Sequence, residues 1–583
     1  MVMPDCSELV TIFSRQSCPL QRTATRVTSM VAFLDDGEPG QTSCTVHANM
    51  ELGYPSRRNR RFVAPGGLRK VRLIPSLIVC GALLVAGLWH AGDARAQGTS
   101  ETVWPTREWQ TSSPEDQGMD SAALAKLVAF GATRSFDSLL IARHGRIVLD
   151  TYYAPYTSDI PHAINSSTKA VIGTLIAILH KEGLLDRLDH PMLDFFPNRL
   201  FANLDERKRA ITVQHLLNMT SGLDWDEGAE GGPEQSLIEL GRSPNWTQFI
   251  LDRPMAHAPG EVFYYNSGGT DLLSAIISKL TSRRAVEYAN AKLFGPLGIA
   301  PPFWRRDPQG LSMGAGGLAL RPHDMAKIGY LYLRGGEWDG RQLLPPEWID
   351  AVSHATIDMH LRADPSLRYA NLFWAIPEKH VYMAVGYHCQ LIMDFPDSDI
   401  VAVVTARNFC SFGKLADLIL SAIKSEAPLP ANPDAVHLLA QAIVDVALEK
   451  PSEVRPTSPL AAAISGKTYQ FQDSPLGLKS LTLNLANPQP TYRIFGRDPT
   501  GITIGIDGPI GLDGFYRKSG RTSLGVPAAK GSWVDDQTFV IDFQYIGLGE
   551  QRRWSLRFEG DKVTLSGKSK DGRDISVDSA PGG

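Results

Sequence analysis

The sequence predicts an α+β fold for the central part of the chain, and three observations carry that prediction. Residues 138–153 have the pattern of a hairpin, with a His-Gly turn between two apolar stretches. A largely helical stretch follows. Strand patterns then return at Val381–Val385, Cys389–Asp394 and Ile400–Ala406. Strands at both ends of one segment, separated by helices, predict one domain whose sheet is completed from both ends.

Helices are expected where apolar residues recur with a helical period. Ser166–Glu182 is the clearest of them, and Gly183 is its stop signal. Further helices are expected at Thr212–Met219, Gly269–Leu280, Ala285–Leu293, Pro322–Tyr332, Pro346–Val352 and Leu415–Ser425. The helical region therefore lies between the early and the late strands.

The composition is that of a folded globular protein. Of the 583 residues, 43% are hydrophobic and 21% are charged, which excludes a disordered or fibrous chain. The net charge of −4 argues against a nucleic-acid-binding protein. Six cysteines are too few for a disulfide-built scaffold of this length.

Residues 1–96 have the features of an upstream extension and a secretory signal. A basic stretch at Arg57–Arg61 precedes a 17-residue apolar run at 73–89, and Ala94-Arg95-Ala96 is a small-x-small cleavage site. A run of this length is at the short limit for a membrane-spanning helix, so an uncleaved anchor is the alternative. We expect export to the periplasm or the cell exterior, with inner-membrane anchoring as that alternative.

The rest of the chain divides into three parts. Residues 97–426 form the α+β domain, and the Pro-rich segment 427–462 is a linker containing one helix. Residues 463–580 alternate short strands with Gly turns and predict a small all-β domain, a barrel or a sandwich.

The best candidate for catalysis is the motif Ser166-Ser-Thr-Lys169. Residues i and i+3 of a helix share a face, so Ser166 and Lys169 lie one turn apart. A serine hydroxyl needs a nearby base, and a neutral lysine can serve. The helix N-terminus would lower the pKa of that lysine and offer the N–H of Ser166 to an oxyanion. The same spacing at Ser421 and Lys424 falls inside an ordinary helix, where a surface role is expected.

A Tyr-x-Asn motif is the second candidate. Tyr264 and Asn266 lie on a loop before a helix, and loops carry chemistry more often than element interiors do. Tyr264 is therefore a candidate general acid or base, with Asn266 positioning the substrate. Two further Tyr-x-Asn sequences are present. Tyr288 fits a helix face, where packing is the expected role, and Tyr369 lies before an expected strand and is not favoured as a functional residue.

The third candidate is Gly386-Tyr387-His388-Cys389-Gln390, at the start of an expected edge strand. An edge strand exposes N–H groups that can bind an oxyanion beside the N–H of Ser166, and it can align an amide substrate. The second oxyanion N–H is assigned to Gln390. His388 is either a substrate-positioning residue or a hydrogen-bonded structural histidine.

Together these motifs resemble the serine β-lactamase-related superfamily. The likeness rests on Ser166-x-x-Lys169, on the sequence 215–223 (HLLNMTSGL) and on Tyr264-x-Asn266-Ser-Gly. It covers about residues 105–425 and is to the class C β-lactamase-like branch, which includes D-alanyl-D-alanine carboxypeptidases, esterases and 6-aminohexanoate-dimer hydrolases. The resemblance implies a β-lactamase/transpeptidase-like antiparallel sheet beside a helical subdomain. It also implies that Ser166 is acylated, Lys169 accepts its proton, and Tyr264 serves the leaving group.

The third motif of the family is Lys-Thr-Gly, His-x-Gly or Gly-x-Gly-Gly-Gln, and residues 386–390 of this chain depart from all three forms. His388 and Cys389 stand where glycines are usual, and no lysine is present there to hold a substrate carboxylate. We therefore expect an exported serine hydrolase acting on a small amide or ester. A class C-like β-lactamase or D-alanyl carboxypeptidase, and a non-catalytic penicillin-binding-like sensor, are the alternatives. The C-terminal domain resembles the lipocalin-like tails of some family members.

The sequence predicts neither a cofactor nor a metal, and it leaves one disulfide open. No metal-ligand spacing such as H-E-x-x-H occurs, and we expect neither cofactor nor metal. Cys389 and Cys410 are the only cysteines after residue 96, and export permits a bridge. A hairpin centred near residue 397 would place Cys389 opposite about residue 405, so the pairing stays open. The sequence does not indicate an oligomeric state.

Overall fold

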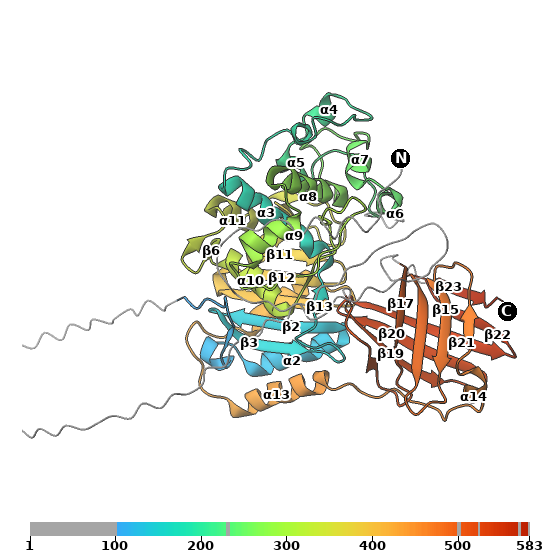
Figure 1. Cartoon of the computed structure of the whole chain (residues 1–583). Coiled ribbons are helices and arrows are strands. Elements are labelled where there is room, and N and C mark those ends of the chain that lie inside the picture. The colour runs from blue at the N-terminus through green and yellow to red at the C-terminus, as the bar shows by residue number, and fades with distance from the viewer. Residues whose placement is uncertain (1–101, 229–233, 498–502, 523–524, 570–572, 581–583) are drawn as a thin grey trace, which may run out of the picture. The chain divides into compact units, whose positions relative to one another are not determined.

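A computed structural model describes residues 102–583, apart from 229–233, 498–502, 523–524, 570–572 and 581–583 (Figure 1). The expected extension, signal and anchor, residues 1–96, lie outside the described residues. Within the described ranges, no helix is both long enough and apolar enough to cross a membrane.

A nine-stranded sheet is the centre of the larger domain, in the order β1-β3-β2-β13-β12-β11-β10-β9-β8. The early hairpin, β2 and β3, joins the late strands because β2 pairs antiparallel with β13, with Leu140 opposite Val403. This confirms a sheet completed from both ends of the segment. The strands are β1 (Gln110–Thr111), β2 (Phe136–Arg143), β3 (Arg146–Tyr152), β8 (Ile357–Asp358), β9 (Arg368–Ala370), β10 (Phe373–Ile376), β11 (Val381–Gly386), β12 (Gln390–Phe395) and β13 (Ile400–Ala406).

Both faces of this sheet are covered, which explains why β2, β12 and β13 are buried along their whole length. Helix α10 (Pro322–Leu333) packs against β2, β12 and β13, and α2 (Ser121–Thr133) packs against β2. Figure 1 shows these two helices on opposite sides of the strands. Helix α12 (Phe412–Ala422) adds to the α2 side.

The helical region contains the remaining helices of this domain, and α3 (Thr168–Lys181) joins it to the sheet. Residues 168–179 of α3 are all buried, since the helix packs against both β11 and α8. The other elements are α4 (Glu206–Arg209), α5 (Val213–Leu217), α6 (Gln235–Arg242), α7 (Trp246–Leu251), α8 (Ser267–Thr281), α9 (Ala285–Ala289) and α11 (Pro346–Ser353), with the short strand pairs β4 (His162–Ala163) with β5 (Ala319–Leu320) and β6 (Glu337–Trp338) with β7 (Arg341–Gln342).

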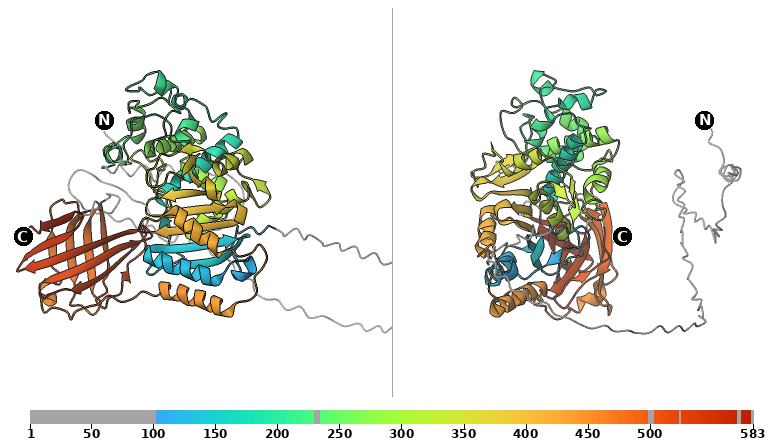
Figure 2. Two further views of the ribbon diagram at one scale, coloured as in Figure 1. Left: turned by 180° about the vertical axis from the view of Figure 1, so that it is seen from behind. Right: turned by 90° about the vertical axis from the view of Figure 1, so that its left-hand side faces the viewer.

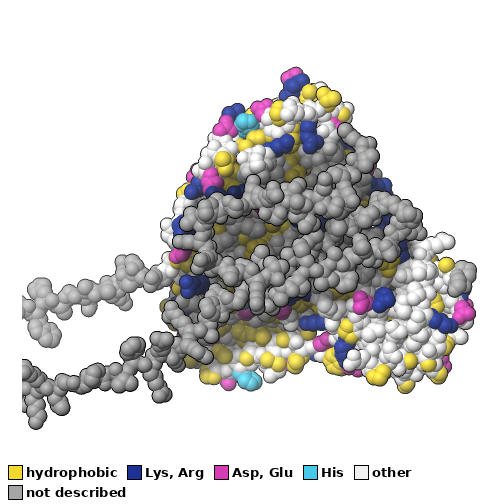
Figure 3. Space-filling view, in the orientation of Figure 1, with side chains coloured by type: hydrophobic (Ala, Val, Ile, Leu, Met, Phe, Trp, Pro, Cys, Tyr) yellow, Lys and Arg dark blue, Asp and Glu magenta, His cyan; other side chains and the backbone are white. Residues whose placement is uncertain are grey.

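The helix expected within the linker packs on the larger domain. Helix α13 (Pro433–Ala447) lies against α2 and β3, Leu439 belongs to the main hydrophobic core, and the Val446 carbonyl accepts the N–H of Ala154 at 2.9 Å. Its outer face keeps Val436, Leu438 and Val444 exposed; Figure 3 shows hydrophobic side chains along this lower edge.

The expectation that residues 386–390 begin an edge strand is wrong. β11 pairs with β10 on one side and with β12 on the other, and β12 also pairs with β13. The short strands β8, β9 and β10 occupy that side of the sheet; of these, the sequence patterns indicated only a strand after Tyr369. However, the pairing of β10 ends at Trp374 opposite Met383, so the last residues of β11 extend beyond β10.

The C-terminal domain is all-β, as expected, and consists of two antiparallel sheets with one hydrophobic core (Figure 2). One sheet has the order β14-β15-β16-β17 and the other β18-β19-β20-β21-β22-β23. Their bounds are β14 (Thr468–Gln470), β15 (Leu478–Asn484), β16 (Thr491–Arg497), β17 (Thr503–Pro509), β18 (Arg517–Lys518), β19 (Val526–Trp533), β20 (Thr538–Ile546), β21 (Glu550–Glu559), β22 (Lys562–Lys568) and β23 (Asp574–Asp578), preceded by the short helix α14 (Leu460–Ile464). The lipocalin-like relationship stays a prediction.

Candidate active site

Ser166 and Lys169 lie at the junction between a loop and helix α3. A 3-10 turn, Asn165–Ser167, leads directly into α3, and Asn165 has a left-handed backbone with φ 48°. The Lys169 Nζ donates a hydrogen bond to the Ser166 Oγ at 2.9 Å. Ser166 is partly exposed, whereas Lys169 is 1% exposed. The i, i+3 spacing therefore yields a buried amine in contact with an accessible hydroxyl.

Partly buried groups surround the Lys169 amine, and the sequence patterns did not indicate them. The Ala315 carbonyl accepts from Lys169 Nζ at 3.1 Å, and the Tyr265 ring lies 4.8 Å from that nitrogen. Asp271 of α8 positions the Ala315 loop, because its Oδ1 accepts the N–H groups of Gly314 at 2.6 Å and Ala315 at 3.3 Å. One carboxylate thus fixes the backbone that in turn holds the lysine.

Burial raises the pKa of Asp271 to about 7, although the backbone N–H groups and the nearby Lys169 act in the opposite direction. In the unfolded chain this carboxyl ionises near 3.8. Between these pH values the folded state holds the extra proton, so stability falls as pH rises through this window and is level above it.

Asp271→Asn is expected to remove that pH dependence, because an amide keeps the Oδ1 acceptor but cannot ionise. The difference in free energy of unfolding between the variant and wild type should increase by about 3 kcal/mol, in favour of the variant, from about pH 5 to about pH 8. Urea unfolding at the two pH values measures it. If this difference in free energy of unfolding were the same at both pH values, Asp271 would not hold the extra proton in the folded state.

The Tyr-x-Asn motif reaches the same site, but its asparagine has a structural role. Asn266 is the N-cap of α8: its Oδ1 accepts the N–H of Gly269 at 3.0 Å, and the residue is 3% exposed. An Asn directly before a helix, able to accept the N–H of the third helical residue, is an N-cap signal that the sequence already contained. Tyr264 is partly exposed, its N–H donates to the Met219 carbonyl at 2.8 Å, and the next residue, Tyr265, contacts Lys169.

The two other candidate motifs lie elsewhere. Ser421 is exposed on α12, where its hydroxyl donates to the Leu418 carbonyl and Lys424 Nζ donates to the Ser421 carbonyl, so serine and amine do not interact. Tyr288 and Tyr369 are buried packing residues.

The segment from Gly386 to Gln390 lies directly against the Ser166 turn. A side chain on Gly386 would overlap the Ile164 carbonyl, so only glycine permits this approach. The Ser167 hydroxyl donates to the Gln390 carbonyl at 2.7 Å, and Asn165 Nδ2 donates to the Tyr387 carbonyl at 3.1 Å. Gln390 itself is 1% exposed, and its side-chain amide holds the loop by donating to the carbonyls of Tyr387 and His388.

An exposed aromatic cluster borders this segment. The rings of Tyr387 and His388 are 3.9 Å apart, and each lies 5.0 Å from the Phe409 ring. Burial lowers the pKa of His388, so its ring is neutral around pH 7. His388, the predicted substrate-positioning residue, therefore has a partly exposed, neutral ring beside the turn that carries Ser166.

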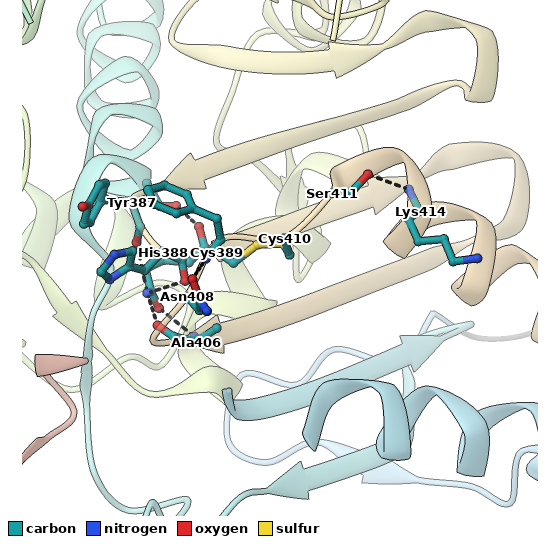
Figure 4. The surroundings of a disulfide bond; sticks show 11 residues. Tyr387, His388, Cys389, Ala406, Asn408, Cys410, Ser411 and Lys414 are labelled. Atoms are coloured by element: carbon teal, nitrogen blue, oxygen red, sulfur yellow. Dashed lines mark hydrogen bonds between the residues drawn. A yellow bond between two sulfur atoms is a disulfide. The ribbon is translucent and has the colours of Figure 1, made fainter. Parts of the chain in front are cut away.

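A disulfide between Cys389 and Cys410 anchors the cluster, and it settles the pairing that the sequence left open (Figure 4). The Cα atoms are 5.9 Å apart. β12 and β13 put Leu391 opposite Val404, so Cys410 reaches Cys389 only because the chain turns back before α12. The bridge joins the two loops that carry Tyr387 and Phe409.

Comparison with known proteins shows what this chain is similar to. The family model Beta-lactamase matches residues 123–406. The sequence is 24% identical over 286 residues to the 6-aminohexanoate-dimer hydrolase of Paenarthrobacter ureafaciens, covering 46% of this chain and 71% of that protein. It is 25% identical over 176 residues to Esterase EstB of Burkholderia gladioli, covering 27% of this chain and 44% of that protein.

Two solved structures are also similar. EstCE1, a hydrolase with promiscuous acyltransferase activity, has a TM-score of 0.44 and 18% identity, covering 52% of this chain and 99% of that chain. The octameric penicillin-binding protein homologue from Pyrococcus abyssi has a TM-score of 0.39 and 18% identity, covering 78% of this chain and 99% of that chain.

Proposed function

We propose that this chain, whose residues 123–406 match the Beta-lactamase family model, is an exported serine hydrolase that cleaves an amide or ester through an acyl-enzyme on Ser166. The observation that carries the proposal is the 2.9 Å contact between the Lys169 amine and the Ser166 hydroxyl. A weak nucleophile paired with a buried potential base is the arrangement that acyl transfer needs.

In this proposal, Ser166 Oγ attacks the substrate carbonyl carbon and neutral Lys169 takes the hydroxyl proton. Tyr264 delivers a proton to the leaving amine or alcohol. Water then attacks the acyl-enzyme and releases the acid, with the same groups moving the proton in the reverse sense.

The developing oxyanion requires two backbone donors. The first is the N–H of Ser166 at the start of α3. Gln390 is 1% exposed and supports the loop from behind. We therefore assign the second donor to the N–H of Tyr387, the residue that follows β11 and whose carbonyl is bound by Asn165.

Export is supported by the disulfide, because bridges persist in oxidising compartments. The substrate is proposed to be small and without an essential carboxylate. The two bridged loops near Ser166 present Tyr387 and His388 on one loop and Phe409 on the other, with no lysine among residues 386–390.

A fluorophosphonate probe tests the proposal. Mass spectrometry of the labelled protein should place one adduct on the peptide containing Ser166, and the peptide containing Ser421 should stay unmodified. Hydrolysis of p-nitrophenyl esters, β-lactams and short ω-amino-acid amides then separates esterase, β-lactamase and amidase. No adduct and no hydrolysis across this panel would mean a non-catalytic binding protein.

A further inference from the structure

A hairpin of the C-terminal domain contacts the segment that leads to Ser166. Residues 546–550 connect β20 to β21, and the Gly547 carbonyl accepts the N–H of Ala163 at 2.6 Å. Ala163 belongs to β4, which pairs on its other side with β5. The last strand before the nucleophile is therefore held between the catalytic domain and the C-terminal domain.

Apolar and ionic contacts hold the hairpin in this place. Ile546 packs in one buried cluster with Tyr156 and Ile160 of the catalytic domain, together with Val526 and Ala528 of β19. Nearby, Arg521 donates to the Asp159 carboxylate at 2.8 Å. The contact therefore combines apolar packing with an exposed ion pair.

The same hairpin also lies close to the end of β13. A methyl group on Gly549 would lie 3.6 Å from the Ala406 carbonyl oxygen, which accepts from Gln390 Nε2 at 2.7 Å. Gln390 in turn holds the Tyr387 carbonyl at 3.1 Å. Burial raises the pKa of Tyr387 and the Glu550 carboxylate adds to this, so the hairpin lies within electrostatic reach of that loop.

Three polar side chains near the hairpin, Asp137, His162 and Arg407, connect these two segments. Asp137 of β2 contacts His162 Nε2 at 2.9 Å and Arg407 Nε at 2.8 Å, and His162 is fully buried. His162 precedes Ala163, and Arg407 follows Ala406. A displacement of the hairpin therefore acts on the segment that leads to Ser166 and on the end of β13, which holds the Tyr387 loop through Gln390.

Gly547 is the position at which this approach is closest. Its φ is 92°, and any side chain there would overlap the Pro161 carbonyl oxygen. Gly560, in the turn between β21 and β22, also has a positive φ of 63°, but a side chain there would meet nothing within 4 Å. The two glycines share the backbone constraint and differ in their contacts.

We infer that the 546–550 hairpin is a positioning element of the active site: it holds the Ser166 turn and the Tyr387 loop at the separation that the oxyanion requires. This inference rests on the proposed serine hydrolase function. It gives the C-terminal domain a part in acylation without any residue of that domain touching the substrate. Gly547 is accordingly a positioning residue.

Gly547→Val tests the inference, with Gly560→Val as the matched control. Displacement of a catalytic group by about 1 Å can cost about 100-fold, so we expect acylation of Gly547→Val to be 10- to 100-fold slower. Gly560→Val should acylate at the wild-type rate. The rate is measured per titrated site with p-nitrophenyl acetate and a fluorophosphonate, alongside thermal unfolding.

The number of titratable sites separates positioning from folding. A positioning role predicts a full count of sites that react slowly, whereas a folding defect predicts fewer sites that react normally. A full or reduced count of Gly547→Val sites reacting at the wild-type rate would overturn the inference and leave the proposed function intact. Failure of the wild-type protein to label would instead count against the proposed function.

A second variant pair covers the case in which Gly547→Val does not fold. Arg521→Glu places like charges at the exposed contact with Asp159, and Asp159→Arg in the same chain restores an opposite pair. We expect acylation to slow about threefold in the single variant and to recover in the double variant. Equal rates in all three proteins would overturn the inference.

Discussion

Ser166→Ala is expected to lower kcat/KM for p-nitrophenyl esters by about 10,000-fold or more, because it removes the atom that forms the acyl-enzyme. The fold should be retained, since Ser166 is partly exposed and alanine is compatible with the turn into α3. Thermal unfolding within about 2 °C of wild type would show this. Steady-state hydrolysis and fluorophosphonate labelling measure the loss.

Ser421→Ala provides the control, because Ser421 has the same S-x-x-K spacing on an exposed helix face. Its kcat/KM should match wild type. If Ser166→Ala retained more than about a tenth of the activity, an acyl-enzyme on this serine would be excluded. Direct attack by water would then be the remaining route.

Lys169→Met is expected to lower kcat/KM by about 100- to 10,000-fold, the range of a general base. Methionine keeps the length of the side chain and suits a site that is 1% exposed, so the protein should stay folded. The loss should appear in the acylation rate, measured by stopped-flow with p-nitrophenyl acetate. Labelling by a fluorophosphonate should slow in parallel.

Two further variants define the role of that amine. Lys169→Arg should not restore activity, because a guanidinium stays protonated and cannot accept the serine proton. Lys424→Met, in the exposed second motif, should leave kcat/KM unchanged. Wild-type acylation rates in Lys169→Met would show that another group activates Ser166.

The parts of this molecule that depend on near neighbours in the chain follow from the sequence. The hairpin of β2 and β3, helix α3 and strands β12 and β13 lie within a few residues of the expected bounds. The contact of Lys169 with Ser166 also follows, because one helical turn brings i and i+3 together whatever surrounds them. The pairing of early strands with late strands of the same segment follows from the order of these elements.

Short strands and loop contacts escaped the sequence patterns. β8 and β9 are two and three residues long, too short to show a period, and together with β10 they make an interior strand of the expected edge strand. Asn266 caps α8, which the sequence analysis did not predict, and its expected contact with substrate stays a prediction. The Cys389–Cys410 bridge needed a chain reversal that strand register alone does not encode.

The sequence by itself determined the α+β order of elements, the all-β C-terminal domain and the Ser166–Lys169 pair, because each arises from periodicity or from spacing within one helix. Only the tertiary structure decided what surrounds that pair: Asp271 fixing the Ala315 loop, the bridge at Cys389, and the Gly547 carbonyl at Ala163. These contacts join residues tens to hundreds of positions apart. Their geometry is set by the packing of whole elements, so no local pattern carries it.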